Sequence, residues 1–263
     1  MNIVITGSTK GIGYSLTEEF LRYGDSVIIS SRNEENIKKA LESLKSKIPN
    51  ANIEGTVCDV SNPQHVKDLI NYSLDKFGSI DIWINNAGST GFEYDKHINI
   101  SDNAIETAIK TNMLGTLFGS REALKIMIKQ GAGKIINLGG YGANGMASPN
   151  LATYGATKSS VPQLTKTLVK ETKNKKIGIH ILLPGMVLTD LLLRNADVRA
   201  KRFFNIVAEK PETIAKKLVP KIRKIKGTGK KIKLNSSLKF IWLLMTARKR
   251  KNRFFDDEGN PVD

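Results

Sequence analysis

Tyr154 and Lys158 lie four positions apart in a segment of helical periodicity, so their side chains face the same way. An ammonium group near a phenol favours the phenolate, which a tyrosine needs when it exchanges protons near neutral pH. Tyr72 and Lys76 share this spacing but lie inside a connecting helix, whereas Tyr154 follows a strand and a glycine-rich loop. Because open α/β sheets bind ligands at the carboxyl ends of their strands, we predict that Tyr154 and Lys158 are catalytic and that Tyr72 is a core or surface residue.

A glycine-rich turn follows the first predicted strand. It reads Thr6-Gly7-Ser8-Thr9-Lys10-Gly11-Ile12-Gly13, and Ile12 opens a helix. Glycines in such a turn let the backbone approach a pyrophosphate, whose charge is met by free amides and the helix dipole. The spacing differs from the common dinucleotide fingerprint, so a tight structural turn is the alternative. We interpret residues 7–13 as a cofactor-binding turn.

The residue that selects between NADH and NADPH is expected at the end of the second strand. An acidic residue there would bind the ribose 2′-hydroxyl of NADH. Ser30-Ser31-Arg32-Asn33 stand there without an acid. Arg32 and the Lys10 of the glycine turn can instead neutralise a 2′-phosphate. The sequence therefore predicts NADPH as the cofactor, and a solvated Arg32 in a helix-capping loop is the alternative.

Short β-branched runs alternate along the chain with longer segments of helical period. Strands are predicted at residues 2–6, 26–31, 52–57, 80–85, 134–138 and 178–183, and helices near 12–23, 34–47, 63–76, 103–129 and 154–173. This alternation predicts a doubly wound α/β fold with helices on both faces of a parallel sheet. After Thr189 the pattern loosens into a helical patch ending at Ala208, a helix beginning at Pro211, a short strand at 231–234 and an apolar stretch, 238–247.

Several motifs follow the predicted strands in the order and spacing of a known family. They are Thr6 to Gly13, Asp59-Val60, Asn85-Asn86-Ala87-Gly88, Asn112, Tyr154 to Lys158, and Pro184-Gly185. Together they resemble the short-chain dehydrogenase/reductase family over residues 1–235. The resemblance implies a seven-stranded Rossmann sheet, with residues 1–235 as the NADP-binding and catalytic domain. Residues 236–263 would be a basic amphipathic C-terminal extension.

The resemblance also implies roles for single residues. Tyr154 would be the catalytic acid/base, Lys158 would bind the nicotinamide ribose and assist Tyr154, and Asn112 would hold a proton-relay water. Asp59 and Val60 would flank the adenine. Further cofactor contacts are implied at strand ends, at Asn86, Ala87, Gly88, Pro184, Gly185, Val187 and Thr189.

One residue of the family pattern is absent. The family has a serine about 13 residues before the tyrosine, and its hydroxyl donates a hydrogen bond to the substrate carbonyl. Tyr141 occupies that position. We predict that Tyr141 supplies this donor, with Asn144 as an alternative and Ser148 as a third candidate.

A narrower resemblance extends to the C-terminus. Its segments include Gln163-Leu164, the run from Pro184 to Leu193, Pro211-Glu212-Thr213, Lys226-Gly227-Thr228-Gly229-Lys230 and Phe255-Asp256-Asp257-Glu258-Gly259. These are similar to the chlorophyll b reductases of plants and algae. The resemblance implies reduction of the C7 formyl group of chlorophyll b or chlorophyllide b to hydroxymethyl. An NADPH-dependent reductase of another large apolar aldehyde or ketone and a non-catalytic NADP-sensing or scaffold protein are the alternatives.

Apolar residues cluster after the sixth strand, at Leu191-Leu192-Leu193 and Phe203-Phe204. A tetrapyrrole needs an apolar lid, so we predict that these residues cap the substrate site, with plain helix packing as the alternative. Family habit implies a homo-oligomer through the helices at 103–129 and 154–173.

The net charge of +16 is concentrated near the C-terminus, because residues 201–263 hold 18 basic and 6 acidic residues. The apolar stretch 238–245 is followed by Arg248 to Lys251 and Arg253. This order predicts peripheral attachment to an anionic membrane, with about 1 kcal/mol from each basic residue near the surface. Packing against the sheet or a partner subunit is the alternative, and no motif for nucleic-acid recognition accompanies the charge.

Cys58 is the single cysteine, which excludes a disulfide framework, and no cluster of histidine, cysteine and carboxylate has metal-ligand spacing. No run approaches the ~20 apolar residues that span a bilayer, and a strand-like segment begins at Asn2. We therefore expect a cytoplasmic protein, with peripheral attachment to a thylakoid-type membrane as a hypothesis. His180, in a predicted buried strand, is interpreted as a core residue.

Overall fold

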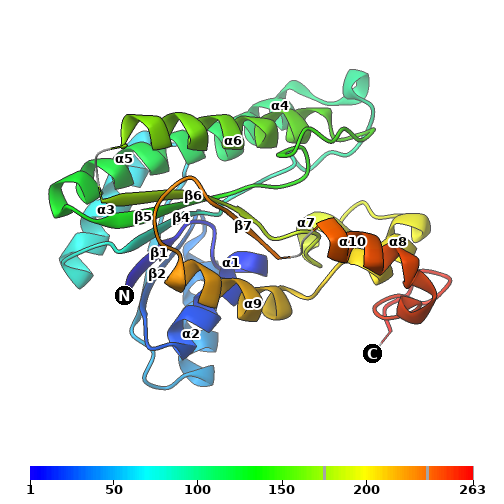
Figure 1. Ribbon diagram of the computed structural model, residues 1–263, viewed down its shortest axis with the longest axis horizontal. Coiled ribbons are helices and arrows are strands. Elements are labelled where there is room, and N and C mark those ends of the chain that lie inside the picture. The colour runs from blue at the N-terminus through cyan, green and yellow to red at the C-terminus, as the bar shows by residue number, and fades with distance from the viewer. Residues whose placement is uncertain (174–175, 235–236, 263) are drawn as a thin grey trace.

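The computed structural model describes residues 1–173, 176–234 and 237–262. Within these residues, seven strands form one sheet in the order β3-β2-β1-β4-β5-β6-β7, and all neighbours are parallel (Figure 1). The predicted doubly wound sheet is confirmed, and each strand lies close to its predicted bounds. The strands are β1 Asn2–Ile5, β2 Ser26–Ser31, β3 Ile53–Val57, β4 Ile82–Asn85, β5 Gly133–Leu138, β6 Ile177–Leu183 and β7 Lys231–Lys233.

Helices cover both faces of the sheet (Figure 1). Because successive side chains of a strand point to opposite faces, β1 supplies both cores: Ile3 and Ile5 face one side and Val4 the other. The helices packed on the face of Ile3 are α1 Gly11–Arg22, α2 Glu34–Lys47 and α9 Pro211–Lys224. Those on the face of Val4 are α3 Pro63–Phe77, α5 Gly115–Gln130 and α6 Ala152–Glu171.

The helix predicted at 103–129 is not continuous. It consists of α4 Asp102–Ile109, a π-helical turn at Lys110–Leu114 and α5, and a short 3₁₀ turn at His97–Asn99 precedes it. A π turn inserts one extra residue and changes the phase of the side chains that follow. Asn112 lies in this turn and is fully buried. The sequence pattern missed the interruption because both flanking helices keep an ordinary period.

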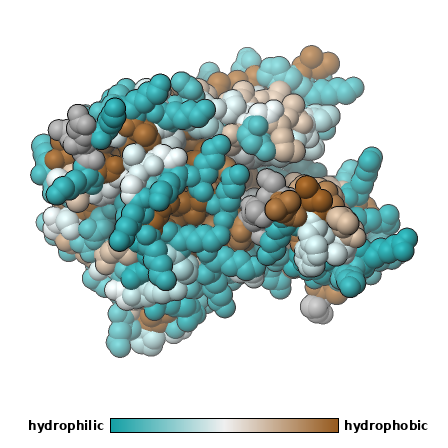
Figure 2. Space-filling view, in the orientation of Figure 1, coloured by the Kyte–Doolittle hydropathy of each residue, from teal (hydrophilic) through white to brown (hydrophobic). Residues whose placement is uncertain are grey.

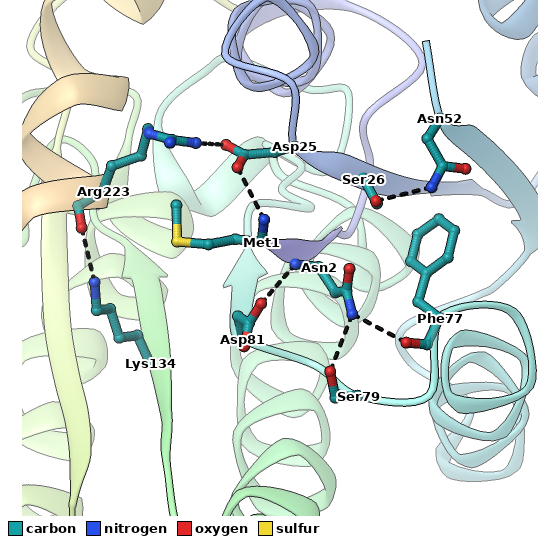
Figure 3. A network of polar contacts seen from close by, with 10 residues as sticks. All are labelled: Met1, Asn2, Asp25, Ser26, Asn52, Phe77, Ser79, Asp81, Lys134 and Arg223. Carbon is teal, nitrogen blue, oxygen red and sulfur yellow. Dashed lines mark hydrogen bonds and ion pairs between the residues drawn. The ribbon is translucent and has the colours of Figure 1, made fainter. Parts of the chain in front are cut away.

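A polar network fixes the end of the sheet where β1 and β2 begin (Figure 3). The buried carboxylate of Asp25 accepts a hydrogen bond from the Met1 amine at 3.1 Å and also pairs with Arg223 of α9. Lys134 of β5 donates to the main-chain oxygen of Arg223 at 3.0 Å, which caps the carboxyl end of α9. These contacts tie α9 to the sheet end opposite the predicted site.

His180 lies in β6 and is fully buried, as predicted for a core histidine. Burial lowers the pKa of its imidazole to about 4, so the ring is neutral at pH 7. The amide of Lys230 donates to Nδ1 at 3.4 Å, which binds the loop before β7 to β6.

After β6 the chain builds what we call the C-terminal lobe, residues 184–209 together with 237–262. The lobe lies at the right of Figure 1, beyond the carboxyl ends of β6 and β7. Phe204, Ala208 and Phe255 form its small core, and residues 237–262 pack against α8. Its helices are α7 Asp190–Leu193, α8 Val198–Val207, α10 Ser237–Met245 and a 3₁₀ turn at Ala247–Arg250.

Two sequence expectations concern this lobe. The predicted domain boundary between residues 235 and 236 lies outside the described residues. The sequence assigns the cations of 248–251 and Arg253 to a lipid surface; in the structure Arg250 and Arg253 form ion pairs with Glu209, and attachment to a membrane stays a prediction. Arg248 and Lys249 are exposed. No helix in the described parts of the chain combines the length and apolar character that would let it cross a bilayer.

Candidate active site

The turn between β1 and α1 is packed directly against the end of β4. Gly7 has φ +62°, and a Cβ placed on it would lie 2.8 Å from the Cα of Ala87. A Cβ on Gly13 would lie 2.4 Å from Nδ2 of Asn86 and 2.7 Å from the Gly7 oxygen. Side chains at residues 7 and 13 would therefore push the turn away from β4, so both positions require glycine.

Asn86 holds the turn in place. Its Nδ2 donates to the main-chain oxygens of Thr6 and Gly7, each at 2.8 Å, while its Oδ1 is buried without a partner among the described residues. The Oγ of Ser30, at the end of β2, is likewise buried and unpaired. No side chain caps the N-terminus of α1, where Lys10 is the N-cap residue. Open amides and unpaired buried oxygens beside a glycine turn fit a dinucleotide cofactor.

The two predicted phosphate-binding cations lie in different surroundings. Arg32 is exposed beyond β2, and no ion pair or hydrogen bond to a described residue holds its guanidinium. Lys10 pairs with Asp190 of α7 at 2.9 Å, and both side chains are largely exposed. Of the remaining residues predicted beside the adenine, Asp59 accepts two hydrogen bonds from Ser61, and Val60 packs where Gly115 leaves room.

The π turn positions a buried hydrogen-bond network. Nδ2 of Asn112 donates to the Ser89 oxygen at 2.8 Å and to Oγ1 of Thr157 at 2.9 Å. Its Oδ1 accepts from the Ser89 amide at 2.8 Å, and Thr157 Oγ1 in turn donates to the Tyr154 oxygen. The side chain of Asn112 thus links the loop after β4 to the first turns of α6, where Tyr154 and Lys158 lie.

Tyr154 and Lys158 are brought together as predicted: the ammonium nitrogen lies 5.8 Å from the centre of the phenol ring. Burial raises the pKa of Tyr154 to about 12 and lowers the pKa of Lys158 to about 8. Lys158 donates to the Leu138 oxygen at 3.3 Å instead of to the phenol. Burial sets the direction of both pKa shifts, because it disfavours the charged form of each group; the effect of the ammonium on the phenol stays a prediction.

Gly140 makes room for the Tyr154 hydroxyl, and the sequence pattern did not predict this contact. A Cβ on Gly140 would lie 2.6 Å from the Tyr154 hydroxyl oxygen. Its neighbour Tyr141, predicted to replace the serine, donates its own hydroxyl to the Ala147 oxygen at 2.8 Å. Oδ1 of Asn144 accepts from the Met146 amide, and Ser148 is half-buried. Tyr141 and Asn144 therefore organise their own loop in this structure.

The loop after β6 reaches the glycine turn. Pro184 is buried, Gly185 has φ +79°, and Val187 forms a bridge with Glu209. A Cβ on Gly11 would lie 3.2 Å from Cγ2 of Thr189. At the end of β4, Gly88 lies close to both Asn112 and Lys158, since a Cβ there would be 3.5 and 3.6 Å from their polar atoms. The strand-end residues predicted to hold one cofactor thus line one edge of the sheet.

The apolar residues predicted to cap the substrate site differ in their packing. Phe204 belongs to the small core of the lobe with Phe255, and Leu192 and Leu193 pack on that core. Leu191 and Phe203 are exposed. In Figure 2 the surface is hollowed between this lobe and the body of the molecule. The alternative of helix packing therefore holds for Phe204.

Tyr72 is a structural residue, as predicted. Its hydroxyl donates to Glu54 of β3 at 3.1 Å, and Lys76 lies 5.5 Å from its ring centre. Thr157 and Ser89 are the other site residues that sequence reasoning missed. Thr157 occurs three residues after Tyr154, where a helix turn places its hydroxyl within reach of the Tyr154 main-chain oxygen, and this spacing is the signal that was available.

Comparisons of sequence agree with this geometry. A family profile described as short chain dehydrogenase matches residues 1–199. The probable chloroplastic chlorophyll(ide) b reductase of Oryza sativa subsp. japonica is 43% identical over 99% of this chain and 55% of its own length. The chloroplastic chlorophyll(ide) b reductase of Arabidopsis thaliana is 42% identical over 98% of this chain and 77% of its own length. The chain spans little more than half of the former protein.

Solved structures share the fold. Serine dehydrogenase complexed with NADP+ superposes with a TM-score of 0.78 at 25% identity, covering 89% of this chain and 94% of that one. Levodione reductase has a TM-score of 0.79 at 22% identity, covering 89% and 95%.

Proposed function

Because the chain belongs to the short-chain dehydrogenase/reductase family, whose members are nicotinamide-dependent oxidoreductases, we propose that it is an NADPH-dependent carbonyl reductase. Its proposed substrate is chlorophyll b or chlorophyllide b, whose C7 formyl group becomes hydroxymethyl. The extent of the similarity carries this proposal. The family profile ends at residue 199, whereas the similarity to the chlorophyll(ide) b reductases covers nearly the whole chain and includes the C-terminal lobe.

Each site residue has a separate role in the proposed reduction. The residues at the strand ends would hold NADPH, which would provide the hydride that the carbonyl carbon needs. Tyr154 has a pKa of about 12, so it is protonated at neutral pH and can donate its proton to the carbonyl oxygen. Lys158 holds the ribose of the cofactor and assists Tyr154. Asn112 fixes the first turns of α6 and keeps the proton-relay water.

Two cations support the choice of NADPH over NADH. Arg32 is unengaged at the end of β2, and Lys10 lies at the N-terminus of α1. Titration with both cofactors tests this choice. Arg32→Ala should weaken NADPH binding about 10- to 100-fold and leave NADH binding unchanged, since a charged hydrogen bond contributes about 1.5–3 kcal/mol. Equal affinity of the unmodified protein for both cofactors would contradict the choice.

The substrate is tested by anaerobic incubation with NADPH and pigment, followed by absorbance. Conversion of chlorophyll b or chlorophyllide b supports the proposal. Unchanged pigment together with turnover of another apolar aldehyde would favour a different substrate. Cofactor binding without turnover of any carbonyl would favour a sensor or scaffold protein.

We also propose a homo-oligomer through the outer faces of α5 and α6. A groove between these helices is lined by five leucine and isoleucine side chains and Phe118, together with Ser120, Arg121, Lys125 and Glu171, and Leu117 and Ile128 are exposed there. A second copy that places the same helices on this groove would bury these side chains. Leu117→Asp should lower the molar mass measured by light scattering, and an unchanged mass would contradict this interface.

The exposed face of α10 supports peripheral binding to an anionic membrane. Leu238, Ile241, Trp242 and Met245 lie at helical spacing and are 79, 54, 56 and 81% exposed. Figure 2 shows this apolar patch on the C-terminal lobe. Arg248 and Lys249 follow it and are exposed, so cations lie beside the apolar stripe as at a lipid interface.

The two tryptophans make this testable by fluorescence, because Trp83 is fully buried and Trp242 is exposed. Emission should shift to the blue with phosphatidylglycerol vesicles at low salt and much less at high salt. Ile241→Glu should abolish the shift, whereas Val262→Glu, at another exposed apolar residue, should keep it. No shift with anionic vesicles would contradict membrane binding. A cytoplasmic or thylakoid-surface location stays a prediction.

A further inference from the structure

Glu209 is joined to the loop after β6 through its main chain. Its amide donates to the Met186 oxygen at 3.1 Å, and its oxygen accepts from the Leu188 amide at 3.0 Å. These two bonds form the parallel bridge between Val187 and Glu209. The position of the loop at Val187 therefore follows the position of Glu209.

The side chain of Glu209 is held by the segment 247–262, which we call the C-terminal arm. Arg250 donates to Oε1 at 3.1 Å and Arg253 donates to Oε2 at 3.0 Å. The carboxylate is 16% exposed and the two guanidinium side chains are 18% and 26% exposed, so solvent screens these pairs less than surface pairs.

The same arginines also bind the last turn of α8. Arg250 Nε donates to the Ile206 oxygen at 2.7 Å, and Arg253 Nη1 donates to the Asn205 oxygen at 3.2 Å. Cations at the carboxyl end of a helix satisfy its free carbonyls and complement its dipole. Each arginine thus binds the end of the helix and the glutamate that follows it.

Asn205 adds a second attachment between the arm and α8. Its Nδ2 donates to the Phe255 oxygen at 2.7 Å, and its Oδ1 accepts from the amides of Phe254 and Phe255 at 2.8 and 3.0 Å. Asn205 is 2% exposed. Phe255 packs in the core of the lobe, against which Met186 and Leu188 also lie.

The loop held in this way ends at the cofactor turn. Thr189 lies against Gly11, and Asp190 pairs with Lys10. A continuous series of contacts therefore runs from Arg250 and Arg253, through Glu209, to the residues beside the glycine turn.

We propose that the C-terminal arm is a brace for the active-site loop, and that Glu209, Arg250 and Arg253 are positioning residues that set the loop at Val187 and Thr189. The inference rests on the proposed function only in that this loop borders the nicotinamide end of the cofactor. The arm has this role in addition to any contact of α10 with lipid, because Arg250 and Arg253 point into the lobe.

The test compares Glu209→Gln, Arg253→Gln and the double variant, with Lys251→Gln as the matched control. Lys251 lies in the same arm, but its ion pair with Asp257 is exposed. The first readout is amide hydrogen exchange, which needs no substrate. Exchange at Leu188 and Glu209 should become faster in the three test variants and stay unchanged in Lys251→Gln.

The second readout is steady-state kinetics with NADPH and the carbonyl substrate. A loop that is present but loosely held should raise the KM for NADPH about tenfold while kcat falls less, whereas a general loss of fold would lower the active fraction and leave KM unchanged. Glu209→Gln removes the ion pairs with both arginines, whereas Arg253→Gln leaves the pair of Arg250 with Glu209, so Arg253→Gln should have the smaller effect. The double variant should exceed Glu209→Gln only by the loss of the Arg253 hydrogen bonds to α8, since the Arg253–Glu209 pair is already absent in each single variant.

Unchanged exchange at Leu188 in all three variants would overturn the brace, whatever the pigment assay shows. If Glu209→Gln does not fold, Arg250→Gln with Arg253→Gln leaves Glu209 intact and gives the same exchange readout. If the unmodified protein binds NADPH normally but does not reduce the pigment, the proposed substrate is wrong. The proposed brace would then still be tested by the hydrogen-exchange measurements.

Discussion

The sheet and the C-terminal lobe hold their parts of the site by different means. Asn112 lies in the π turn before α5, Tyr154 and Lys158 lie in α6, and both helices pack on one of the two large cores of the seven-stranded sheet. The loop at Val187 and Thr189 rests on a core of three buried residues, with ion pairs and side-chain hydrogen bonds to the arm. Under the proposed function, the reacting groups thus lie on the larger core, and the loop proposed to border the nicotinamide end of the cofactor lies on the part that can open locally.

Among the predictions, Tyr154→Phe, in a helix packed on the sheet, should have the largest effect on activity. Removing the hydroxyl removes the proton donor and should lower kcat about 10³-fold, while cofactor binding and stability stay unchanged. Tyr72→Phe is the matched control, because Tyr72 has the same Tyr-Lys spacing on α3 and its hydroxyl hydrogen-bonds to Glu54 on β3, away from the candidate site. Turnover retained in Tyr154→Phe would refute the mechanism.

Core truncations compare the two regions directly. Ile136 of β5 is fully buried, and Ile136→Ala should lower the free energy of unfolding by about 2–5 kcal/mol. Phe255→Ala should shift the global unfolding midpoint much less, because the arm can detach while the sheet stays folded. Chemical denaturation together with hydrogen exchange measures both. Equal global losses would show that the lobe and the sheet unfold as one unit.

The pH dependence of stability reports on His180 in the sheet. Its pKa is about 4 when folded and 6.5 in the unfolded chain, so the unfolded state binds the proton first as pH falls. The contribution of neutral His180 to the free energy of unfolding is therefore complete above pH 6.5. It decreases by about 3 kcal/mol as the pH falls towards 4. His180→Gln should flatten the pH profile of the unfolding free energy over this range. A profile as steep as that of the unmodified protein would assign the acid sensitivity to other groups.

The exposed pair of Lys10 and Asp190, which joins the two regions, should have the smallest effect. Asp190→Asn should change the unfolding free energy by less than about 1 kcal/mol, since exposed ion pairs contribute little. The same change frees Lys10 for a phosphate and should tighten NADPH binding slightly. Weaker NADPH binding in this variant would show that the pair pre-orders the turn instead.

The difference between the regions also explains what the sequence could predict. Strand and helix periodicity located the sheet. Helical spacing proposed Tyr154 and Lys158 as site residues, and the family resemblance proposed Asn112. The π turn at 110–114 was missed because one extra residue leaves the hydrophobic pattern of both flanking helices intact. The low exposure of Lys158 was missed because burial depends on distant elements that spacing does not encode.

The lobe was predicted least well, and the reason is physical. A run such as Arg248 to Lys251 has the same composition whether its cations meet lipid or a carboxylate. The direction of Arg250 depends on Glu209, 41 residues earlier in the chain, and no local pattern encodes that contact. The prediction that Phe204 caps the substrate site has the same weakness, because Phe204 packs against Phe255, about 50 residues later in the chain.

The short strand β7 affects whether two molecules can associate through the edge of the sheet. It is the last strand of the sheet, has only three residues, and exposes Lys231 and Lys233 on either side of the buried Ile232. A second molecule that tried to extend the sheet at this edge in an antiparallel, two-fold arrangement would bring lysines against lysines over a very short pairing length. Edge-to-edge polymerisation into fibrils is therefore disfavoured here, even though the parallel sheet is rich in isoleucine.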